Sequence, residues 1–244
     1  MNWTSPISSS RSSIRFGFST RIGGVSEGAY GTAGNGLNLA THVGDDPSRV
    51  ARNREIAREL FGLPKVAYMD QVHGNDVAII TSANFNQTPT ADALVTSEPG
   101  IALAVLVADC VPLIMHDRGT GVIAAVHVGR RGLVNGVVER TVSAMRALGA
   151  ESINAIMGPA ICGDCYEVPL AMQQEVGAIA PLSPSVTDLG TPGLDIRDGI
   201  AWQLEQLTIE AMIDPICTRR SDLHYSYRRD GVTGRTAGFI HLVP

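Results

Sequence analysis

The chain has 244 residues, of which 44% are hydrophobic and 18% are charged, as in an ordinary globular protein. A chain of this length can bury a core without needing disulfides or a structural metal. Its 19 Lys and Arg residues against 24 Asp and Glu residues give a net charge of −5, which argues against binding to nucleic acid or to an anionic membrane.

The N-terminal segment is rich in serine and has no apolar stretch of the kind found in secretory signals. We therefore expect a cytoplasmic protein whose residues 1–14 are flexible. No internal repeat is visible, and no linker rich in Pro, Gly or Ser divides the chain. The sequence thus predicts one domain over residues 1–244. The longest apolar run, 101–115, is shorter than the roughly 20 residues of a membrane-spanning helix.

Four segments have the apolar spacing or the end signals of helices. They cover residues 45–63, 132–149, 169–180 and 194–213. The first begins with Asp46 as a capping residue and Pro47 at the first helical position. The second and fourth carry apolar residues at helical spacing and are ended by Gly149 and Pro215. The third pattern is shorter and weaker.

Short runs rich in Val and Ile separate these helices. They cover residues 66–69, 76–80, 102–107, 112–117, 122–128 and 153–158. Several are apolar at consecutive positions, as in strands that are covered on both faces. Residues 224–243 predict two more strands around a glycine-containing loop. Since strands outnumber helices without strict alternation, we expect an α/β (α+β) fold, a mixed β-sheet sandwich flanked by helices.

Cys110 and His127 each end a predicted buried strand, where a rigid sheet can position functional side chains. Asp109 precedes Cys110 and is an ionisable residue that needs a partner or a solvent opening at the end of an apolar run. His73 lies in a predicted loop before a Gly-Asn turn.

The residue types alone leave three interpretations open. His73, Cys110 and His127 would suit zinc and leave a fourth position free, although their spacing matches no compact zinc motif. Cys110 and His127 could instead form a nucleophile and its base. Both could also be core residues, since free cysteine is often buried.

Arginines gather in two places where an anion could bind. Arg130 and Arg131 follow His127 at a predicted helix start, where free N–H groups and a partial positive charge favour anions. Arg228, Arg229 and Arg235 lie in the predicted C-terminal hairpin, and arginine suits bidentate phosphate binding. Ordinary solvated charge is the alternative at both places. The remaining histidines are interpreted as structural or surface residues: His42, His116, His224 and His241.

Cys162 and Cys165 have two residues between them, a Cys-x-x-Cys spacing found in redox pairs and in halves of zinc sites. No second such pair and no thioredoxin-like context accompanies them. The sequence therefore favours two thiols in a loop rich in Gly and Pro, and it places Cys217 in the core.

Several segments together resemble the laccase-domain family, whose members are described as multicopper polyphenol oxidoreductases and as purine nucleoside phosphorylases. In the family's order they are "STRIGGVS", "LNLATHVGDD", "QVHGNDV", "ADALVT", "ALAVLVADCVPL", "AAVHVGRRGL", "GPAICGDCYEV" and "SYRRDGVTGR". The resemblance implies a mixed α/β sandwich related to the deamidase domain of cytotoxic necrotizing factor toxins. It also implies one zinc ion bound by His73, Cys110 and His127. Arg130 departs from the family pattern, which usually has tryptophan there.

The resemblance further implies phosphorolysis of purine nucleosides to a base and ribose 1-phosphate, together with deamination of adenosine. The partners would be a purine nucleoside and phosphate, and the protein would be a monomer or a small homo-oligomer. Cys110 and Asp109 are the catalytic candidates. The candidates for contacting substrate or phosphate are Asn38, Arg131, Arg228 and Arg235.

Three other functions stay open at this point. A copper-dependent polyphenol oxidase is one, although six histidines are too few for a multi-histidine copper cluster with an electron-transfer site. Copper could still occupy the zinc site, because it binds nitrogen and sulfur ligands more tightly. The second is a cysteine-type amide hydrolase or peptidoglycan editing factor. The third is a non-catalytic zinc-binding partner protein.

Overall fold

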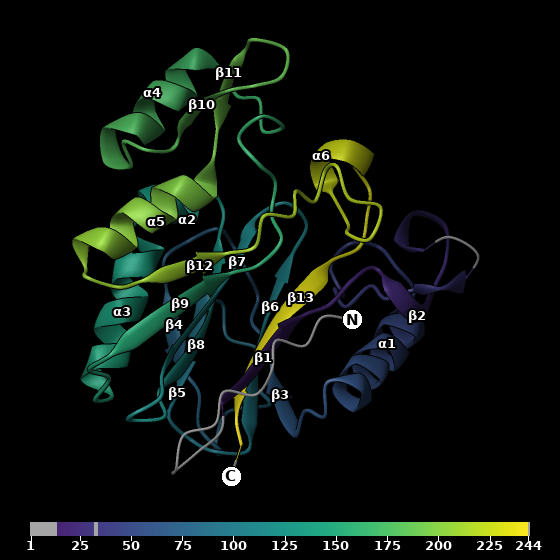
Figure 1. The fold of residues 1–244 in the computed structure, drawn as a ribbon. Helices are drawn as coiled ribbons and strands as arrows, with labels where there is room; N and C mark the ends of the chain where they lie inside the picture. Colours follow the sequence, from purple (N-terminus) through teal and green to yellow (C-terminus); the bar gives the residue numbers. More distant parts are fainter. Residues whose placement is uncertain (1–13, 32–33, 244) are drawn as a thin grey trace.

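The computed structural model describes residues 14–31 and 34–243, and two β-sheets packed face to face form its centre (Figure 1). The four-stranded sheet has the order β1-β13-β6-β3, and the six-stranded sheet has the order β12-β9-β7-β8-β5-β4. The first consists of β1 (Ile14–Phe18), β13 (Thr236–Leu242), β6 (Ile101–Val107) and β3 (Lys65–Ala67). The second consists of β12 (Ala211–Ile213), β9 (Ile153–Met157), β7 (Val111–Asp117), β8 (Ile123–Val128), β5 (Ala93–Thr96) and β4 (Val77–Ile79).

Parallel and antiparallel pairs occur in both sheets. The pairs β3–β6, β4–β5 and β9–β12 are parallel, and the other pairs within the two sheets are antiparallel. The predicted mixed α/β sandwich is therefore confirmed. The predicted flexible start falls almost entirely on residues 1–13, which lie outside the described residues, and Ile14 is the first residue of β1.

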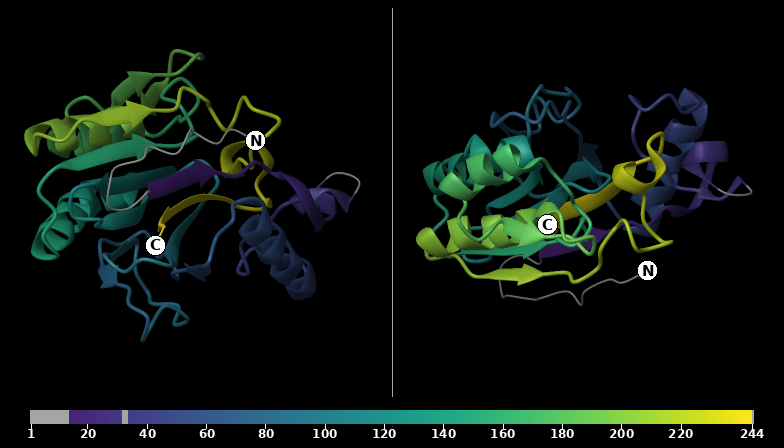
Figure 2. Two further views of the ribbon diagram at one scale, coloured as in Figure 1. Left: turned by 60° about the horizontal axis from the view of Figure 1, so that its bottom comes forward. Right: turned by 90° about the horizontal axis from the view of Figure 1, so that it is seen from above.

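Helices cover the outer faces of the two sheets (Figure 2). Helix α1 (Pro47–Leu60) lies beside the four-stranded sheet, and α2 (Arg130–Val134), α3 (Val137–Ala147) and α5 (Ile196–Gln206) lie on the six-stranded sheet. The smaller elements are β2 (Ile22–Ser26), the 3-10 helix Gly28–Tyr30, α4 (Leu170–Ile179), the hairpin of β10 (Pro184–Val186) and β11 (Pro192–Leu194), and α6 (Tyr227–Asp230).

Strand β6 shows why consecutive apolar residues build this sandwich. Leu103 and Val105 point into the layer between the two sheets, where they pack with Ile114 of β7. Ala102 and Ala104 point to the other face, toward the cluster formed with α1. Both faces of the strand are buried. Its sequence therefore lacks the alternation of apolar and polar residues that is typical of a half-exposed strand.

The helix predicted over residues 194–213 ends instead at Gln206. Thr208 takes a positive φ of 59°, which a right-handed helix cannot continue through. Ile209 donates its N–H back to the carbonyl of Leu204 and packs in the same cluster, as at helix ends closed by a left-handed residue. The chain then pairs with β9 as β12, so the apolar spacing over residues 211–213 belongs to a strand.

Two other predicted elements also differ. The helix expected over residues 132–149 is the pair α2 and α3, interrupted at Gly136 with φ of 79°. The first of the two strands expected within residues 224–243 is replaced by α6, whose first turn is capped by Ser226 accepting the N–H of Arg229. The hydroxyl cap at this position favours a helical turn over a strand.

None of the helices in the described part of the chain combines the length and the apolar character needed to cross a membrane.

Candidate metal centre and pocket

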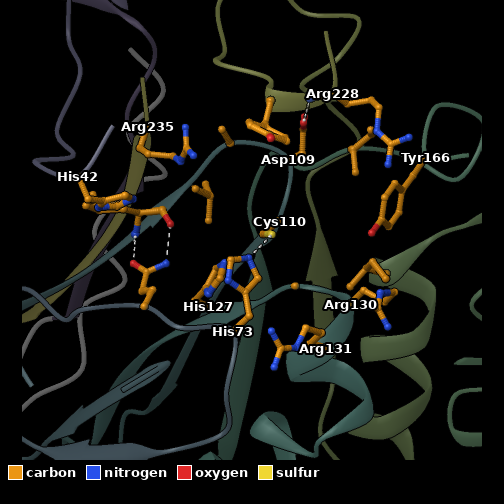
Figure 3. Close-up of a pocket in the computed structure, with 18 residues that line it drawn as sticks. His42, His73, Asp109, Cys110, His127, Arg130, Arg131, Tyr166, Arg228 and Arg235 are labelled. Carbon is orange, nitrogen blue, oxygen red and sulfur yellow. Dashed lines mark hydrogen bonds between the residues drawn. The ribbon is translucent and has the colours of Figure 1, made fainter. Parts of the chain in front are cut away.

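His73, Cys110 and His127 meet at one end of the sandwich (Figure 3). Their ligand atoms all lie within 4.8 Å of one another, and Cys110 Sγ is 3.9 Å from His73 Nε2. The rings of His73 and His127 meet edge to face, with their centroids 4.7 Å apart. The predicted convergence of these three residues is therefore seen in the structure, although 37 and 17 residues separate them along the chain.

Two of the three residues lie where the chain passes from one sheet to the other. His73 follows β3 of the four-stranded sheet and precedes β4 of the six-stranded sheet. Cys110 likewise lies between β6 and β7, in the bend just before β7 begins at Val111. His127 is buried in β8. The site therefore lies where the chain crosses between the two sheets of the sandwich.

Asp92, directly before β5, organises the site and is fully buried. Its carboxylate accepts the N–H groups of His73 (3.0 Å) and Gly74 (2.6 Å) and lies 2.8 Å from His127 Nδ1. The contact with Nδ1 leaves His127 Nε2 directed toward Cys110 and His73. An aspartate behind a histidine ligand fixes the ring and its tautomer, as is usual around protein-bound metals.

Local backbone geometry makes the close approach possible. His73 has a positive φ of 60°, a strained conformation that the hydrogen bonds to Asp92 hold in place. Gln71 exchanges two hydrogen bonds with the backbone of Leu106 in β6, which fixes the loop against the sheet. A Cβ atom at Gly129 would lie 3.0 Å from Cys110 Sγ and 3.0 Å from the His73 ring. Any side chain at Gly129 would push Cys110 or His73 aside by a few tenths of an ångström, so glycine leaves these two residues their positions.

The thiol and the imidazole of this site shift each other's pKa. Burial opposes ionisation of Cys110, but the charge and hydrogen bonds of His127 and His73 outweigh it and lower the thiol pKa to about 6. Burial lowers the pKa of His127, while Cys110 and Asp92 raise it, and the net result is about 9. Without a metal the pair is held as thiolate and imidazolium near neutral pH. A metal ion would displace that imidazolium proton.

A cavity of about 400 Å³ opens above the three residues. Its apolar walls include Leu106, Val107, Ile161 and Ile196, and four arginines also line it: Arg130, Arg131, Arg228 and Arg235. Among the predicted anion-binding residues, Arg131, Arg228 and Arg235 thus face the same cavity. Arg229 does not line it, because its guanidinium pairs with Asp230 and bonds the carbonyls of Thr218, Ser221 and His224.

Asp109 also lines the cavity, but both of its carboxylate oxygens are already engaged. One accepts the hydroxyl of Thr218 (2.6 Å) and the other accepts the backbone N–H of Arg228 (2.6 Å). Its own carbonyl accepts the N–H of Ile161. Asp109 has a positive φ of 87° and thereby turns the chain toward Cys110. Asp109 thus connects three segments around the pocket, those of Ile161, Thr218 and Arg228.

Arg130 and Tyr166 line the same side of the cavity, close enough to interact with each other (Figure 3). Burial raises the pKa of the Tyr166 phenol, and the charge and hydrogen bond of Arg130 oppose that rise. The guanidinium of Arg228 lies 5.0 Å from the centre of the Tyr166 ring. Tyr166 is therefore held between two arginines, and an aromatic wall is present although the family's tryptophan is not.

Asn38 lies outside the lining of the cavity and is fully buried. Its side-chain carbonyl accepts the backbone N–H groups of Ala40 and Arg235, and its amide donates to Asp45. Asn38 therefore reaches the pocket only through the backbone of Arg235. The Arg235 guanidinium is fixed in turn by the carbonyls of Thr233 and Gly234.

Sequence reasoning missed three groups of this site. Asp92 lies in "ADALVT", where only its place before a strand could have indicated it. Tyr166 follows the Cys-x-x-Cys segment, whose spacing indicates a role only for the two thiols. His42 was interpreted as structural or surface, but it lines the cavity, and burial and Arg235 lower its pKa.

The donor set suits a metal ion. Two imidazole nitrogens and one thiolate are ligands that zinc and copper accept, and three protein ligands leave a coordination position open toward the cavity. The Asp92–His127 pair supplies the outer hydrogen bond expected of such a site. The residues present thus fit a metal centre, both in the chemistry of their donor atoms and in the hydrogen bond between His127 and Asp92.

The chain belongs to the family described as multi-copper polyphenol oxidoreductase laccase, because the family model matches residues 15–243. A protein from Streptomyces coelicolor named purine nucleoside phosphorylase is 49% identical over 93% of this chain and 95% of its own. One of the same name from Corynebacterium glutamicum is 47% identical over 94% of each chain.

Solved structures agree with this assignment of the fold. A Neisseria meningitidis protein is 34% identical and superposes with a TM-score of 0.86 over the whole of both chains. YlmD from Geobacillus stearothermophilus is 30% identical and gives a TM-score of 0.85, covering 95% of this chain and 92% of its own. The resemblance stated from the sequence motifs is confirmed.

Proposed function

We propose that this protein is a zinc-dependent purine nucleoside phosphorylase. The observation that carries the proposal is the meeting of a His-Cys-His centre with four arginines in one open cavity of about 400 Å³. Such a cavity offers a cation, anion-binding groups and apolar walls together, which suits a substrate pair of phosphate and an aromatic base on a sugar. The names of the two bacterial relatives support the same assignment.

His73, Cys110 and His127 would hold the zinc ion, which when bound would supply Lewis-acid stabilisation of negative charge in the cavity. Asp92 holds the His127 ring so that Nε2 faces the site, and it fixes the His73 loop through backbone hydrogen bonds. Cys110 serves as a thiolate ligand.

Phosphate would bind among the arginines that line the cavity, and Arg131 and Arg235 lie on either side of the ligand cluster (Figure 3). Arginine holds phosphate through paired hydrogen bonds and keeps its charge at any physiological pH. Asn38 supports Arg235 through its backbone. These groups hold the attacking phosphate oxygen next to C1′ of the nucleoside.

The base would lie on the Tyr166 side of the cavity, where the ring and the apolar residue Ile161 form a wall. In the reaction a phosphate oxygen forms a bond to C1′ and the bond from C1′ to the base nitrogen breaks. The bonding electrons leave with the base, which takes up a proton to match the one that the attacking hydrogen phosphate gives up. Asp109 keeps the surrounding segments in place through Thr218 and Arg228.

A blue-copper oxidase fits the residues less well. Among the described residues, only two groups of His, Cys, Asp or Glu come close enough to hold a metal, and neither has more than two histidines. Multicopper oxidation needs a larger histidine cluster together with an electron-transfer site. All four cysteines are free thiols, which supports our inference of a reducing compartment such as the cytoplasm.

The test is to incubate purified, zinc-loaded protein with adenosine, with and without phosphate, and to separate the products. We expect adenine and ribose 1-phosphate only when phosphate is present. Inosine without release of a base would identify a deaminase instead. If neither product forms with zinc-loaded protein, the phosphorylase assignment is wrong.

Two variants in the same loop sharpen this test. His73→Ala should lower both zinc occupancy and kcat/KM, the latter by on the order of 100-fold or more, since it removes a ligand and not only an outer partner. Asn75→Ala is the matched control, because the Asn75 amide bonds the carbonyl of Asn135 away from the cavity. It should retain zinc and activity.

A further inference from the structure

A second group of metal-binding side chains lies away from the cavity lining. Cys162 and Cys165 come from the loop after β9, and Cys217 comes from the segment after β12. The three sulfur atoms all lie within 4.8 Å of one another. The sequence predicted two loop thiols and a third cysteine in the core, whereas the structure brings all three together and leaves Cys162 and Cys217 only partly buried.

Backbone hydrogen bonds hold these three residues in place. Ala160 and Cys217 form a parallel bridge, in which Thr218 donates its N–H to the carbonyl of Ala160. The carbonyl of Cys162 accepts the N–H groups of Cys165 and Tyr166, which closes the turn between the paired cysteines.

The turn itself is also fixed. Gly163 donates its N–H to the carboxylate of Asp195, at 2.9 Å. A Cβ atom at Gly163 would lie only 2.5 Å from the Ser185 hydroxyl oxygen, so this position has no room for a side chain. Contacts with Asp195 and Ser185 therefore fix the backbone of the turn. The two cysteine side chains of the turn start from this fixed backbone.

The surroundings of the sulfurs differ from those of core cysteines. Among the described residues, none of the three belongs to a hydrophobic cluster of the sandwich. Cys217 Sγ accepts the backbone N–H of Cys162 at 3.4 Å, a hydrogen bond that favours the thiolate. The guanidinium groups of Arg197 and Arg220 are near enough to Cys162 to interact with its charge. Burial and the neighbouring thiols raise the pKa of the Cys162 thiol, so a bound metal ion would have to displace its proton.

We propose that Cys162, Cys165 and Cys217 bind a second zinc ion in a structural role, separate from the metal centre of the cavity. Three thiolates are soft ligands that select zinc or copper(I), and an iron–sulfur cluster would need four cysteines. At a zinc–sulfur distance of about 2.3 Å, tetrahedral geometry places sulfurs about 3.8 Å apart, within the separation seen here. The fourth position would be taken by a solvent molecule, because Cys162 and Cys217 are only partly buried.

Charge distinguishes zinc from copper(I) at this place. Three thiolates with Zn²⁺ carry one net negative charge, whereas the same thiolates with copper(I) carry two. Arg197 and Arg220 are the nearby cations, but each is also paired with aspartate: Arg197 with Asp195, and Arg220 with Asp164 and Asp188. The remaining positive charge is small, so the complex with the smaller negative charge is favoured.

The proposed ion would connect two segments that form the wall of the cavity. Ile161, next to Cys162, lines the cavity, as does Tyr166, next to Cys165. Thr218, next to Cys217, donates its hydroxyl to Asp109. A zinc ion across the three thiols would thus hold the positions of Ile161, Tyr166 and Asp109 relative to one another.

The test measures zinc per chain in protein purified under reducing conditions and equilibrated with zinc alone. We expect two zinc ions in the unaltered protein and one in the double variant His73→Ala/Cys110→Ser, which lacks two of the three ligands of the cavity. Adding Cys217→Ser to the double variant should abolish the remaining ion. Cobalt in the double variant should give a sulfur-to-metal charge-transfer band, and Cys217→Ser should remove that band.

Asp164→Asn in the double variant is the matched control, because Asp164 lies between the paired cysteines without being one of the close ligands. It should retain the ion. If the Cys217→Ser chain does not fold, the folded double variant still decides the question, since only the second site remains in it. Absence of zinc there with all thiols reduced, or a disulfide between these cysteines that persists under the reducing conditions, overturns the proposal.

Discussion

Asp92 is a single residue on which the geometry of the metal centre depends, because it contacts two of the three ligand-bearing segments at once. In Asp92→Asn an amide replaces the carboxylate, and one of its two polar atoms can no longer accept the N–H groups of the loop. We expect zinc affinity to fall by about 10–100-fold, the usual effect of losing an outer partner. Competition with a chromophoric chelator measures it.

Asp76→Asn is the control for this change, since Asp76 is exposed and pairs loosely with Arg140 at 3.6 Å. It should bind zinc as the unaltered protein does. Equal zinc affinity in Asp92→Asn and Asp76→Asn would show that the buried carboxylate does not support the ligands.

Arg130 carries a charge where the family usually has an apolar ring. In Arg130→Gln the charge is lost from the cavity while a shorter polar side chain remains. A hydrogen bond to a charged group contributes about 1.5–3 kcal/mol, so we expect KM for phosphate to rise on the order of 10-fold or more, with a smaller change for the nucleoside.

Steady-state kinetics with each substrate varied in turn separates the two effects. Arg118→Gln, a substitution outside the cavity lining, should leave both KM values unchanged. A rise in the nucleoside KM alone would indicate that Arg130 contacts the base and not the phosphate.

At the scale of a single element, the end of α5 holds measurable strain. Thr208 is exposed and branched at Cβ, yet it adopts φ of 59°, where L residues other than glycine cost roughly 1–2 kcal/mol. Thr208→Gly should remove part of this strain and raise the melting temperature by about 2–4 °C, the shift that about 1 kcal/mol gives in a chain of this size.

Thermal unfolding followed by circular dichroism measures the change. Thr120→Gly is the comparison, because Thr120 is exposed and has a negative φ. That variant should gain no stability. A fall in the melting temperature of Thr208→Gly would mean that the conformation at this helix end is not strained.

Strand β13 contains a second unfavourable feature, the buried imidazole of His241. Neither ring nitrogen has a hydrogen-bond partner among the described residues, and burial followed by the charge of Arg15 lowers the pKa of His241 to about 4. Its value in an unfolded chain is about 6.5. Between these two values only the unfolded state binds the proton, so stability falls as the pH falls from about 6.5 to about 4.

His241→Leu should therefore lose part of this pH dependence. At about 1.36 kcal/mol per pKa unit, the difference between the two proteins grows by up to about 3 kcal/mol across this window. Urea unfolding of both proteins at pH 7, 5.5 and 4.5 measures it. Parallel losses of stability in the two proteins would contradict the prediction.

At the scale of the whole molecule, the sequence could predict the two-sheet sandwich because its strands are apolar on consecutive positions. It also indicated His73, Cys110 and His127, since the motifs around them resemble a known family. It could not indicate Asp92 or the three-cysteine group, because these depend on contacts between segments far apart in the chain. Cys217 is 52 residues from Cys165 in the sequence, and no local pattern encodes that contact.

The boundaries of the elements depended on features that apolar spacing does not reveal. Residues 211–213 have helical spacing with α5 but become β12 once Thr208 reverses the backbone. Asn38 was predicted at the substrate because it lies in a family motif, but it is fully buried behind the pocket, where it accepts the backbone N–H of Arg235. The single-domain organisation stays a prediction.

The position of His73 and Cys110 at the passages between the two sheets has a consequence for how the chain reaches its native state. Neither sheet alone contains the three ligands, so high metal affinity can arise only after both sheets have formed and docked. A ligand present at about 1,000 times its dissociation constant adds about 4 kcal/mol to the folded state alone. Zinc would therefore have little effect on the rate of the early, local steps of folding. It would stabilise the docked sheets after they form and so slow unfolding.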